Sequence, residues 1–487
     1  MAAPPATPAT PATPPAPGVR APKSRFDRSI VAGPIAPAVW RLAWPTMLQN
    51  AFGGLQGIVD HVMVGNFVGY NGNAAIGVSW QIFLVVMVFV SSLFTGMAVL
   101  VARFAGADDP EKVNRTVAQA MITAAVLSVL VLAPIGWFAT PWLLTLVNAE
   151  PAVAAEALPF LRIMFVASLG MMMFFMLGGA LRAAGDARTP LRLGIALTVG
   201  NIALNLVLIP GFGPVPRLGT MGAAIGTNLA GTIISGYAIY RLWKGDWVIS
   251  VRDTSWRPDW SIVRALFRFG LPTGVQGVAM NIAGVLLLRF IGSLDQSAEA
   301  QAAYAVGYTE LFSLITWTSV GLMGASAAYA GQNLGAGHPD RAVEGVKVAT
   351  RIGLGVAIFV AILFLTMPRL LLGAFGMSDP AVVEIGVQLL TFLSVSGLFI
   401  SVALVHTGGL QGTGDTRGPL YISIVSQIVI PLGICSVIEA MRELQPLDIW
   451  TAILVGHATR CLLSVLRFRQ GKWRAIRVEI EPVRPAH

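Results

Sequence analysis

Long apolar runs separated by short polar breaks are the feature that most constrains this chain. Between about residue 35 and residue 468, twelve such runs reach the roughly 20 residues that an α-helix needs to cross a bilayer. Only 12% of the 487 residues are charged, 55% are hydrophobic, and the mean hydropathy is +0.71. A soluble domain carries about 25% charged residues. The sequence therefore predicts an all-α integral membrane protein with twelve transmembrane helices.

The basic residues are unevenly distributed among the predicted loops. The formal net charge is +9, but the bases lie between apolar runs rather than along one stripe, so we expect no nucleic-acid partner. If both termini lie on one side of the membrane, most of the 33 Lys and Arg residues fall on that side. The exceptions are Arg162, Arg217, Arg289, Arg369 and Arg442. Because basic loops stay in the cytoplasm, the pattern predicts cytoplasmic termini and a multi-pass location in the inner or plasma membrane.

Composition divides the chain into five segments. Residues 1–34 begin with a Pro-, Ala- and Thr-rich stretch, which we interpret as a disordered cytoplasmic tail rather than a signal peptide. Two six-helix lobes are expected at 35–243 and 264–468, joined by a cytoplasmic linker at 244–263. Residues 469–487 form a basic cytoplasmic tail that we expect to contact anionic membrane lipid.

An internal repeat relates the two predicted lobes. GALRAAGDARTPL at 179–191 aligns with GGLQGTGDTRGPL at 408–420, and Pro45 aligns with Pro272 at nearly the same offset. Six spans per repeat give both lobes the same orientation, as in transporters whose parallel repeats are related by an axis along the membrane normal. Substrate would then bind between the lobes, and rocking of one lobe against the other would alternate access. The alternative is a duplicated scaffold that transports nothing.

Ionisable side chains within the apolar runs are candidates for function because each is costly to place in a bilayer. Asp60 lies fifteen residues after Pro45, and its counterpart in the repeat is Leu287, so this acid belongs to one lobe only. Loss of water disfavours the charged form of a carboxylate, which makes Asp60 a candidate proton carrier. The alternative is an acid near the external end of its helix, solvated or paired with His61.

Other polar residues in the apolar runs extend this hypothesis. Asn201 and Asn205 are spaced i, i+4 and share one helix face, and Thr227 follows a run of small residues. Their side chains can bind a cation, contact Asp60, or hold helices together. Glu310 also lacks an acidic counterpart in the repeat, and it is either a second cation-binding carboxylate or an interfacial glutamate.

The sequence contains no motif of the common enzyme classes. His-Glu-x-x-His, Gly-x-Ser-x-Gly and Gly-x-x-x-x-Gly-Lys patterns are all missing, so we predict that the protein is not an enzyme and has no cofactor. Cys435 and Cys461 have no metal-ligand spacing, and the one metal ion that we consider is Na⁺ at Asp60. Uphill transport would therefore draw on an H⁺ or Na⁺ gradient or on a partner ATPase.

Together these motifs resemble the multidrug and toxic compound extrusion (MATE) family of secondary transporters. The resemblance covers about residues 35–468 and depends on VDHVMVGN, LRAAGDARTP, NIALNLVLIPG followed by GAAIGT, and QNLGAGHPDRA. It implies a two-lobed, twelve-helix antiporter that exports small organic compounds in exchange for H⁺ or Na⁺. These substrates are often amphipathic cations and include drugs and other xenobiotics. We expect the transporter to act as a monomer.

The resemblance also implies roles for single residues. Asp60 matches an aspartate that is implicated in cation coupling, and Asn201, Asn205 and Thr227 match polar groups around it. Pro45 matches the proline at which the first helix is proposed to bend, so we expect a hinge there.

The sequence departs from the family pattern at some positions, which limits the roles that the resemblance implies. Some members have a second cation site with two acids in the C-terminal lobe, but Met280 and Ile400 stand at those positions here, which favours the N-terminal lobe. Glu310 resembles a glutamate of the eukaryotic members. The alternative function is a flippase of the same wider superfamily that moves a lipid or a lipid-linked oligosaccharide. Such a flippase favours bases lining the central cavity, for which Arg162 and Arg289 are the candidates.

Overall fold

The computed structural model describes residues 25–147, 150–478 and 480, and all regular secondary structure in these residues is helical. The N-terminal half contains α1 (Ser29–Ala32), α2 (Ile35–Phe67), α3 (Tyr70–Gly106), α4 (Pro110–Val126), the π-helical η1 (Leu127–Leu132), α5 (Ala133–Leu146), α6 (Pro151–Val166), α7 (Leu169–Ala183), α8 (Arg188–Leu208) and α9 (Gly219–Lys244). The C-terminal half contains α10 (Trp260–Gly292), α11 (Ser297–Tyr304), the π-helical η2 (Ala305–Leu311), α12 (Ser313–Gly335), α13 (Pro339–Thr366), α14 (Pro368–Ala374), α15 (Pro380–Gly412), α16 (Arg417–Ile424), the π-helical η3 (Val425–Val429), α17 (Ile430–Met441), α18 (Pro446–Arg469) and the 3₁₀ turn η4 (Lys472–Ala475).

The lengths and hydropathy of these helices fit a multi-pass membrane protein. Among the described residues, eight helices are long and apolar enough to cross a membrane, or up to ten if each of two bent pairs is one span. The bent pairs are the two parts of α3, at an angle of 41°, and α6 with α7, at 52°. The long helices α2 and α9 occupy the two other predicted spans, with 33 and 26 residues. They contain polar and glycine residues, which lower their mean hydropathy.

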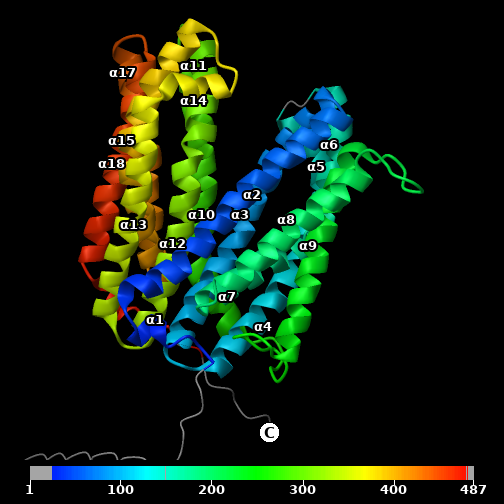
Figure 1. Cartoon of the computed structure of the whole chain (residues 1–487), viewed down its shortest axis with the longest axis vertical. Helices are drawn as coiled ribbons and strands as arrows, with labels where there is room; N and C mark the ends of the chain where they lie inside the picture. The colour runs from blue at the N-terminus through cyan, green and yellow to red at the C-terminus, as the bar shows by residue number, and fades with distance from the viewer. Residues whose placement is uncertain (1–24, 148–149, 479, 481–487) are drawn as a thin grey trace, which may run out of the picture.

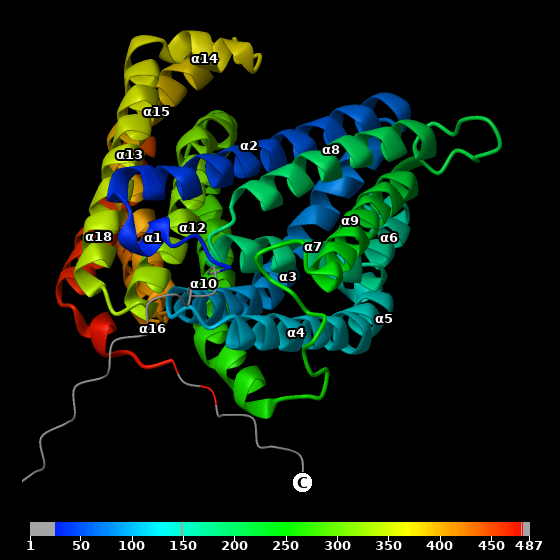
Figure 2. The ribbon, with the colours of Figure 1, turned by 60° about the horizontal axis from the view of Figure 1, so that its bottom comes forward.

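The helices form two bundles that converge at one end of the molecule and diverge at the other (Figure 1). One bundle contains α2 to α9, and the other contains α10 to α18. Within the first bundle α2 runs beside α8, as two views show (Figure 1, Figure 2). Between the bundles, α3 packs against α10 and α2 packs against α12. The all-helical membrane fold with two repeats is therefore confirmed.

Glycines allow the two bundles to approach closely where they converge. A Cβ atom on Gly106 of α3 would lie 1.9 Å from the carbonyl oxygen of Gln332 in α12. A Cβ atom on Gly335 of α12 would lie 2.1 Å from the carbonyl oxygen of Arg103 in α3. Gly106 and Arg103 align with Gly335 and Gln332 at the same offset as the two Gly-Asp-x-Arg motifs of the repeat. The two contacts, which we call the interlobe seam, are therefore equivalent by the internal symmetry.

The two Gly-Asp-x-Arg turns of the repeat have the same geometry. Gly185 and Gly414 both adopt a φ of 99°, a conformation that favours glycine. The following acid accepts a hydrogen bond from the backbone N–H three residues further on, at 3.0 Å for both Asp186 and Asp415. Each carboxylate therefore caps the start of the next helix in the same way.

The first described residues correct one prediction. Residues 25–34 are folded rather than part of a disordered tail over 1–34, whereas residues 1–24 lie outside the described residues. α1 buries Ile30, and the Asn333 amide donates a hydrogen bond to the Ile30 carbonyl at 3.2 Å. The low-complexity composition ends before this segment, and burial of its apolar side chains is favourable.

The described part of the basic C-terminal segment also packs against the bundle. Trp473 is 1% exposed, and its indole N–H donates to the Phe468 carbonyl at 2.8 Å. Arg474 forms an ion pair with Asp340 at 2.9 Å. The segment 470–478 is thus attached to the protein, in addition to any lipid that its bases contact.

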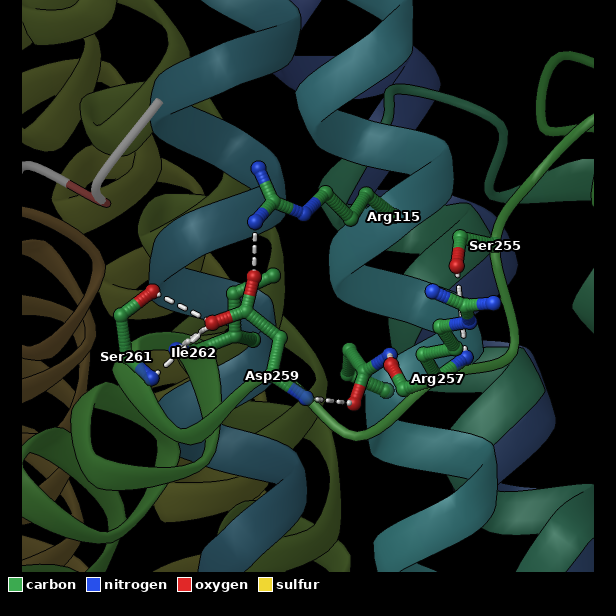
Figure 3. Close-up of polar contacts among 7 residues, drawn as sticks. Arg115, Ser255, Arg257, Asp259, Ser261 and Ile262 are labelled. Atoms are coloured by element: carbon green, nitrogen blue, oxygen red, sulfur yellow. Dashed lines mark hydrogen bonds and ion pairs between the residues drawn. The ribbon is translucent and has the colours of Figure 1, made fainter. Parts of the chain in front are cut away.

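The predicted linker between the lobes is attached to the N-terminal bundle through α4 (Figure 3). Asp259 precedes α10 and accepts a hydrogen bond from the Ser261 N–H at 3.0 Å, and it forms an ion pair with Arg115 of α4. Gln119 of α4 accepts from the Asp259 N–H at 2.9 Å and donates to the Arg257 carbonyl at 2.7 Å. The first helix of the C-terminal lobe therefore begins at a contact with the N-terminal bundle.

Candidate cation-binding site

The four polar residues predicted for the N-terminal lobe lie in one hydrogen-bonded chain. Asn205 Nδ2 donates to Asp60 Oδ1 at 2.8 Å and lies 3.4 Å from Asn201 Oδ1. Asn201 Nδ2 donates to Thr227 Oγ1 at 3.0 Å. The chain connects three helices, because Asp60 belongs to α2, the two amides to α8 and Thr227 to α9. The structure thus brings together all four residues of the predicted N-terminal site.

Helix periodicity and small residues explain how this chain forms. The i, i+4 spacing places both amides on the same face of α8, where Asn201 and Asn205 are fully buried. Asp60 is half-buried on α2. Gly226 of α9 lies against the amide of Asn205, and a Cβ atom there would lie 2.0 Å from Asn205 Oδ1. We did not predict a role for Gly226, although the run GAAIGT around it indicated close helix packing.

One oxygen of the hydrogen-bonded chain has no donor among the described residues. Asn205 Oδ1 is buried and accepts no hydrogen bond from these residues, whereas buried acceptors are normally satisfied. The Asp60 carboxylate and the amide oxygens of Asn201 and Asn205 are oxygen donors of the kind that hard cations prefer. Among the described residues, no three His, Cys, Asp or Glu side chains gather as they would around a transition metal.

Pro45 and Glu310 have different relations to this chain. Pro45 lies inside α2, where proline removes one backbone hydrogen bond of the helix. The next residue, Thr46, donates through Oγ1 to the Gly321 carbonyl of α12 at 3.0 Å, so α2 is held to the other lobe beside its proline. Glu310 lies in η2 of the C-terminal lobe with an exposed side chain, outside the chain around Asp60.

The residues at the positions of a second cation site and of a flippase cavity lie outside the chain around Asp60. Met280 lines a cavity of about 160 Å³ in the C-terminal lobe, and Ile400 is buried there, so neither position supplies an acid. The guanidinium of Arg162 lies over the Trp137 ring, 4.8 Å from its centroid, and Arg289 is exposed.

Two basic residues in α18 are buried, although the sequence does not predict a role for them. His457 and Arg460 are 2% and 6% exposed, respectively. They lie within a predicted span, and their signal was the pair of ionisable residues three positions apart in an apolar run.

Comparisons with known proteins agree with this architecture. The MatE family model matches residues 45–207 and 272–436. The two matches begin at Pro45 and Pro272, which the internal repeat pairs, and their ends are related by the offset of the Gly-Asp-x-Arg motifs. A solved structure described as an outward-facing conformation of a multidrug resistance MATE family transporter superposes with a TM-score of 0.84 at 20% identity. The superposition covers 94% of this chain and all of that one.

Curated relatives cover nearly the same length. The chain is 26% identical over 433 residues to the probable multidrug resistance protein NorM of Thermotoga maritima, covering 89% of this chain and 92% of the relative. It is 27% identical over 449 residues to the probable multidrug resistance protein NorM of Deinococcus radiodurans, covering 88% and 94%. With two family matches spanning most of its length, the chain belongs to the MatE family of multidrug and toxic compound extrusion transporters, which are not enzymes.

Proposed function

We propose that the protein is a cation-coupled antiporter that exports small organic compounds, with Asp60 as the group that binds H⁺ or Na⁺. The observation that carries this proposal is the hydrogen-bonded chain from Asp60 through Asn205 and Asn201 to Thr227. A carboxylate within a membrane-spanning helix is costly, and here it accepts a hydrogen bond from the buried amide of Asn205, whose oxygen has no donor among the described residues. The probable multidrug resistance proteins among its relatives support drugs as the exported class, and we extend this proposal to other organic xenobiotics, often amphipathic cations.

The charge of Asp60 determines how strongly it accepts the hydrogen bond from Asn205. When ionised, the carboxylate accepts the hydrogen bond from Asn205 Nδ2. When it binds H⁺ or shares its oxygens with Na⁺, it becomes a weaker acceptor, because hydrogen bonds to charged groups are the stronger ones. The amides of Asn205 and Asn201 then reorient, and the change reaches Thr227. Cation binding thus alters how α2, α8 and α9 are joined.

Pro45 connects this change to alternating access. Thr46 holds α2 to α12, whereas Asp60 lies fifteen residues further along the same helix than Pro45. The missing backbone hydrogen bond at Pro45 allows α2 to bend between the two attachments. Solved relatives described as MATE in the straight and in the bent conformation are compatible with two such states. Bending upon cation binding would lower the affinity for the exported drug, and cation release would restore it.

The orientation and assembly belong to the same proposal. The positive-inside pattern supports cytoplasmic termini, so the end where the two bundles diverge would face the outside. Glu310 is exposed in the other lobe, and we assign it no part in coupling at Asp60. The transporter would work as a monomer surrounded by membrane lipid, since each chain contains both lobes.

Transport into proteoliposomes tests this function. With an imposed pH or Na⁺ gradient, the wild-type protein should move an organic cation against its concentration gradient, and Asp60→Asn should abolish the gradient-driven component. Glu384→Gln, which neutralises an exposed acid in α15, is the matched control and should transport normally. Full gradient-driven transport by Asp60→Asn would refute the assignment of Asp60. Lipid translocation that ignores both gradients would favour the flippase.

A further inference from the structure

The C-terminal lobe contains a cavity at the place that mirrors the Asp60 chain. The cavity has a volume of about 160 Å³, and we call it the C-lobe cavity. Its walls include Met280, Gly284 and Leu287 of α10, Tyr308 of η2, Gln427 of η3 and His457 of α18. In the repeat alignment Leu287 is the counterpart of Asp60, and the offset of the Gly-Asp-x-Arg motifs places Thr227 opposite Gly456, the neighbour of His457. The two lobes therefore have equivalent sites with different side chains.

A buried arginine lies one helical turn from this cavity. Arg460 is 6% exposed, and Ile453, His457 and Arg460 share one face of α18 at i, i+4 and i+7. Ile453 and His457 line the cavity, so the side chain of Arg460 leaves α18 on the face that forms the cavity wall. Arg460 lies nine residues before the end of α18, or roughly 14 Å of helix, so it is deep within the span.

Within the described part of the chain, this guanidinium has no anionic partner. Arg460 Nε is buried and makes no hydrogen bond, and no acid among the described residues pairs with Arg460. A buried charge is strongly unfavourable unless it is paired and hydrogen-bonded. His457 Nδ1 is likewise buried and makes no hydrogen bond to these residues. The charge of Arg460 therefore lacks an anionic partner among the described residues, and His457 Nδ1 lacks a hydrogen-bond partner among them.

A column of stacked aromatic rings contributes to the cavity wall. The rings of Tyr304 and Tyr308 stack with centroids 4.9 Å apart and an interplanar angle of 8°. His457 continues the stack, 6.4 Å from Tyr308 at 11°. Tyr308 and Gln427 both come from π-helical segments, which frequently occur at functional sites. Because the ring faces cover one another, a flat aromatic ligand can meet the edges of these rings in an edge-to-face arrangement.

We propose that the C-lobe cavity binds a small aromatic carboxylate, with the carboxylate on Arg460 and the ring against Tyr308 and His457. A carboxylate accepts two parallel hydrogen bonds from a guanidinium, which matches the unmet need of Arg460. An apolar cavity of about 150 Å³ holds benzene, so the C-lobe cavity has room for one ring. The proposal does not depend on cation coupling, since it involves residues of the other lobe only.

Binding of benzoate to the purified full-length transporter tests the charge of the ligand. Labelled benzoate should bind saturably, and benzamide, which is neutral, and benzylamine, which is cationic, should compete at least about tenfold less well, since a charge-assisted hydrogen bond is lost. Inorganic phosphate should not compete, because it lacks the ring. Equal competition by benzylamine, displacement by phosphate, or the absence of benzoate binding would each overturn the proposal.

Two variants test separately the charge of Arg460 and the volume of the C-lobe cavity. Arg460→Met removes the charge at similar volume, and Gly284→Leu fills the cavity while leaving Arg460 in place. A Cβ atom on Gly284 meets no atom within 4 Å, so this side chain can be accommodated without a clash at Cβ. Each variant should weaken benzoate binding at least about tenfold. Gly355→Leu on α13, where a Cβ atom also meets nothing within 4 Å, is the matched control and should bind normally.

Thermal unfolding of each variant shows whether its binding result can be interpreted. If Arg460→Met unfolds at a lower temperature than the wild type, benzoate binding by Gly284→Leu is the result that tests the proposal, because this variant keeps Arg460. Benzoate binding that persists unchanged in a folded Gly284→Leu protein would show that the ligand lies elsewhere.

Discussion

Gly226 supports the polar chain by having no side chain. A Cβ atom at this position would lie 2.0 Å from Asn205 Oδ1, so Gly226→Ala must displace the amide that donates to Asp60. We expect gradient-driven transport to fall roughly tenfold or more, since a hydrogen bond to a charged group is weakened. Transport in proteoliposomes with an imposed gradient measures this effect.

The same helix provides the control for that prediction. Gly236 also lies in α9, but a Cβ atom there meets nothing within 4 Å. Gly236→Ala should leave transport unchanged and favour the helix slightly, because alanine has the higher helix propensity. Equal transport by the two alanine variants would contradict the supporting role of Gly226.

The residues of the candidate site differ in how far the sequence predicts them. Polar side chains in apolar runs must face one another or water, so Asp60, Asn201 and Asn205 were predictable as a group. Gly226 was not, because its role depends on how close α9 approaches α8. Arg460 is not predicted either, since a base in the second half of a span resembles an orientation signal until its burial is known.

At the scale of elements, the start of α10 depends on one ionised carboxyl group. Partial burial alone would raise the pKa of Asp259, but the hydrogen bonds from Ser261 and the charge of Arg115 outweigh it and hold that pKa below its ordinary value. A lowered folded-state pKa stabilises the protein above the unfolded-state value of about 4. This contribution is lost as the pH falls through the lower folded-state pKa.

Removal of this cap should therefore have a pH-dependent cost. Asp259→Ala should lower the free energy of unfolding by about 1 to 2 kcal/mol at pH 7, and the difference from wild type should shrink below about pH 4. Thermal unfolding in detergent measures both effects. Asp253→Ala, an exposed acid of the same linker, should unfold like the wild type. A Tm difference for Asp259→Ala that stays constant down to pH 2 would contradict the role of its charge.

The membrane-spanning helices are predictable from the sequence where an apolar run is continuous, and less so where polar residues interrupt the run. α2 and α9 fall below the hydropathy of the other spans because their inward faces carry residues such as Asp60 and Thr227. The sequence indicates a tail at α1 because its few apolar residues follow a low-complexity stretch. Its fold depends on a tertiary contact with α12, which no local pattern encodes.

At the scale of the whole molecule, the interlobe seam sets how closely the bundles converge. Gly335→Val would place side-chain atoms against the Arg103 carbonyl, and Gly106→Val would do the same at Gln332. Because the two contacts are equivalent, each variant should lower the free energy of unfolding by a similar amount, about 1 to 3 kcal/mol. Each should also reduce transport.

Measurement of Tm and transport on both variants tests this equivalence. Gly324→Val also lies on α12, but a Cβ atom there meets nothing within 4 Å, so it should affect neither quantity. A large effect of Gly335→Val without a comparable effect of Gly106→Val would contradict the symmetry of the seam.

The arrangement of the two lobes was predictable only in part. The internal repeat predicted two equivalent halves, and the two family matches are offset along the chain in the same way. The angle between the bundles depends on contacts between glycines and backbone carbonyls, such as that of Gly106 with Gln332. These contacts leave no pattern in the hydropathy.

The equivalence of the two seam contacts has a consequence for how the halves can diverge. The seam resembles the isologous interface of a homodimer whose subunits have been joined into one chain. In one chain the two copies of the contact are encoded separately, so the close approach of the lobes needs a glycine at both Gly106 and Gly335. A pocket inside one lobe is free of that constraint. Duplication thus lets the side chains of the two pockets diverge while the contacts between the lobes stay alike, and the acid Asp60 in one half corresponds to the apolar Leu287 in the other.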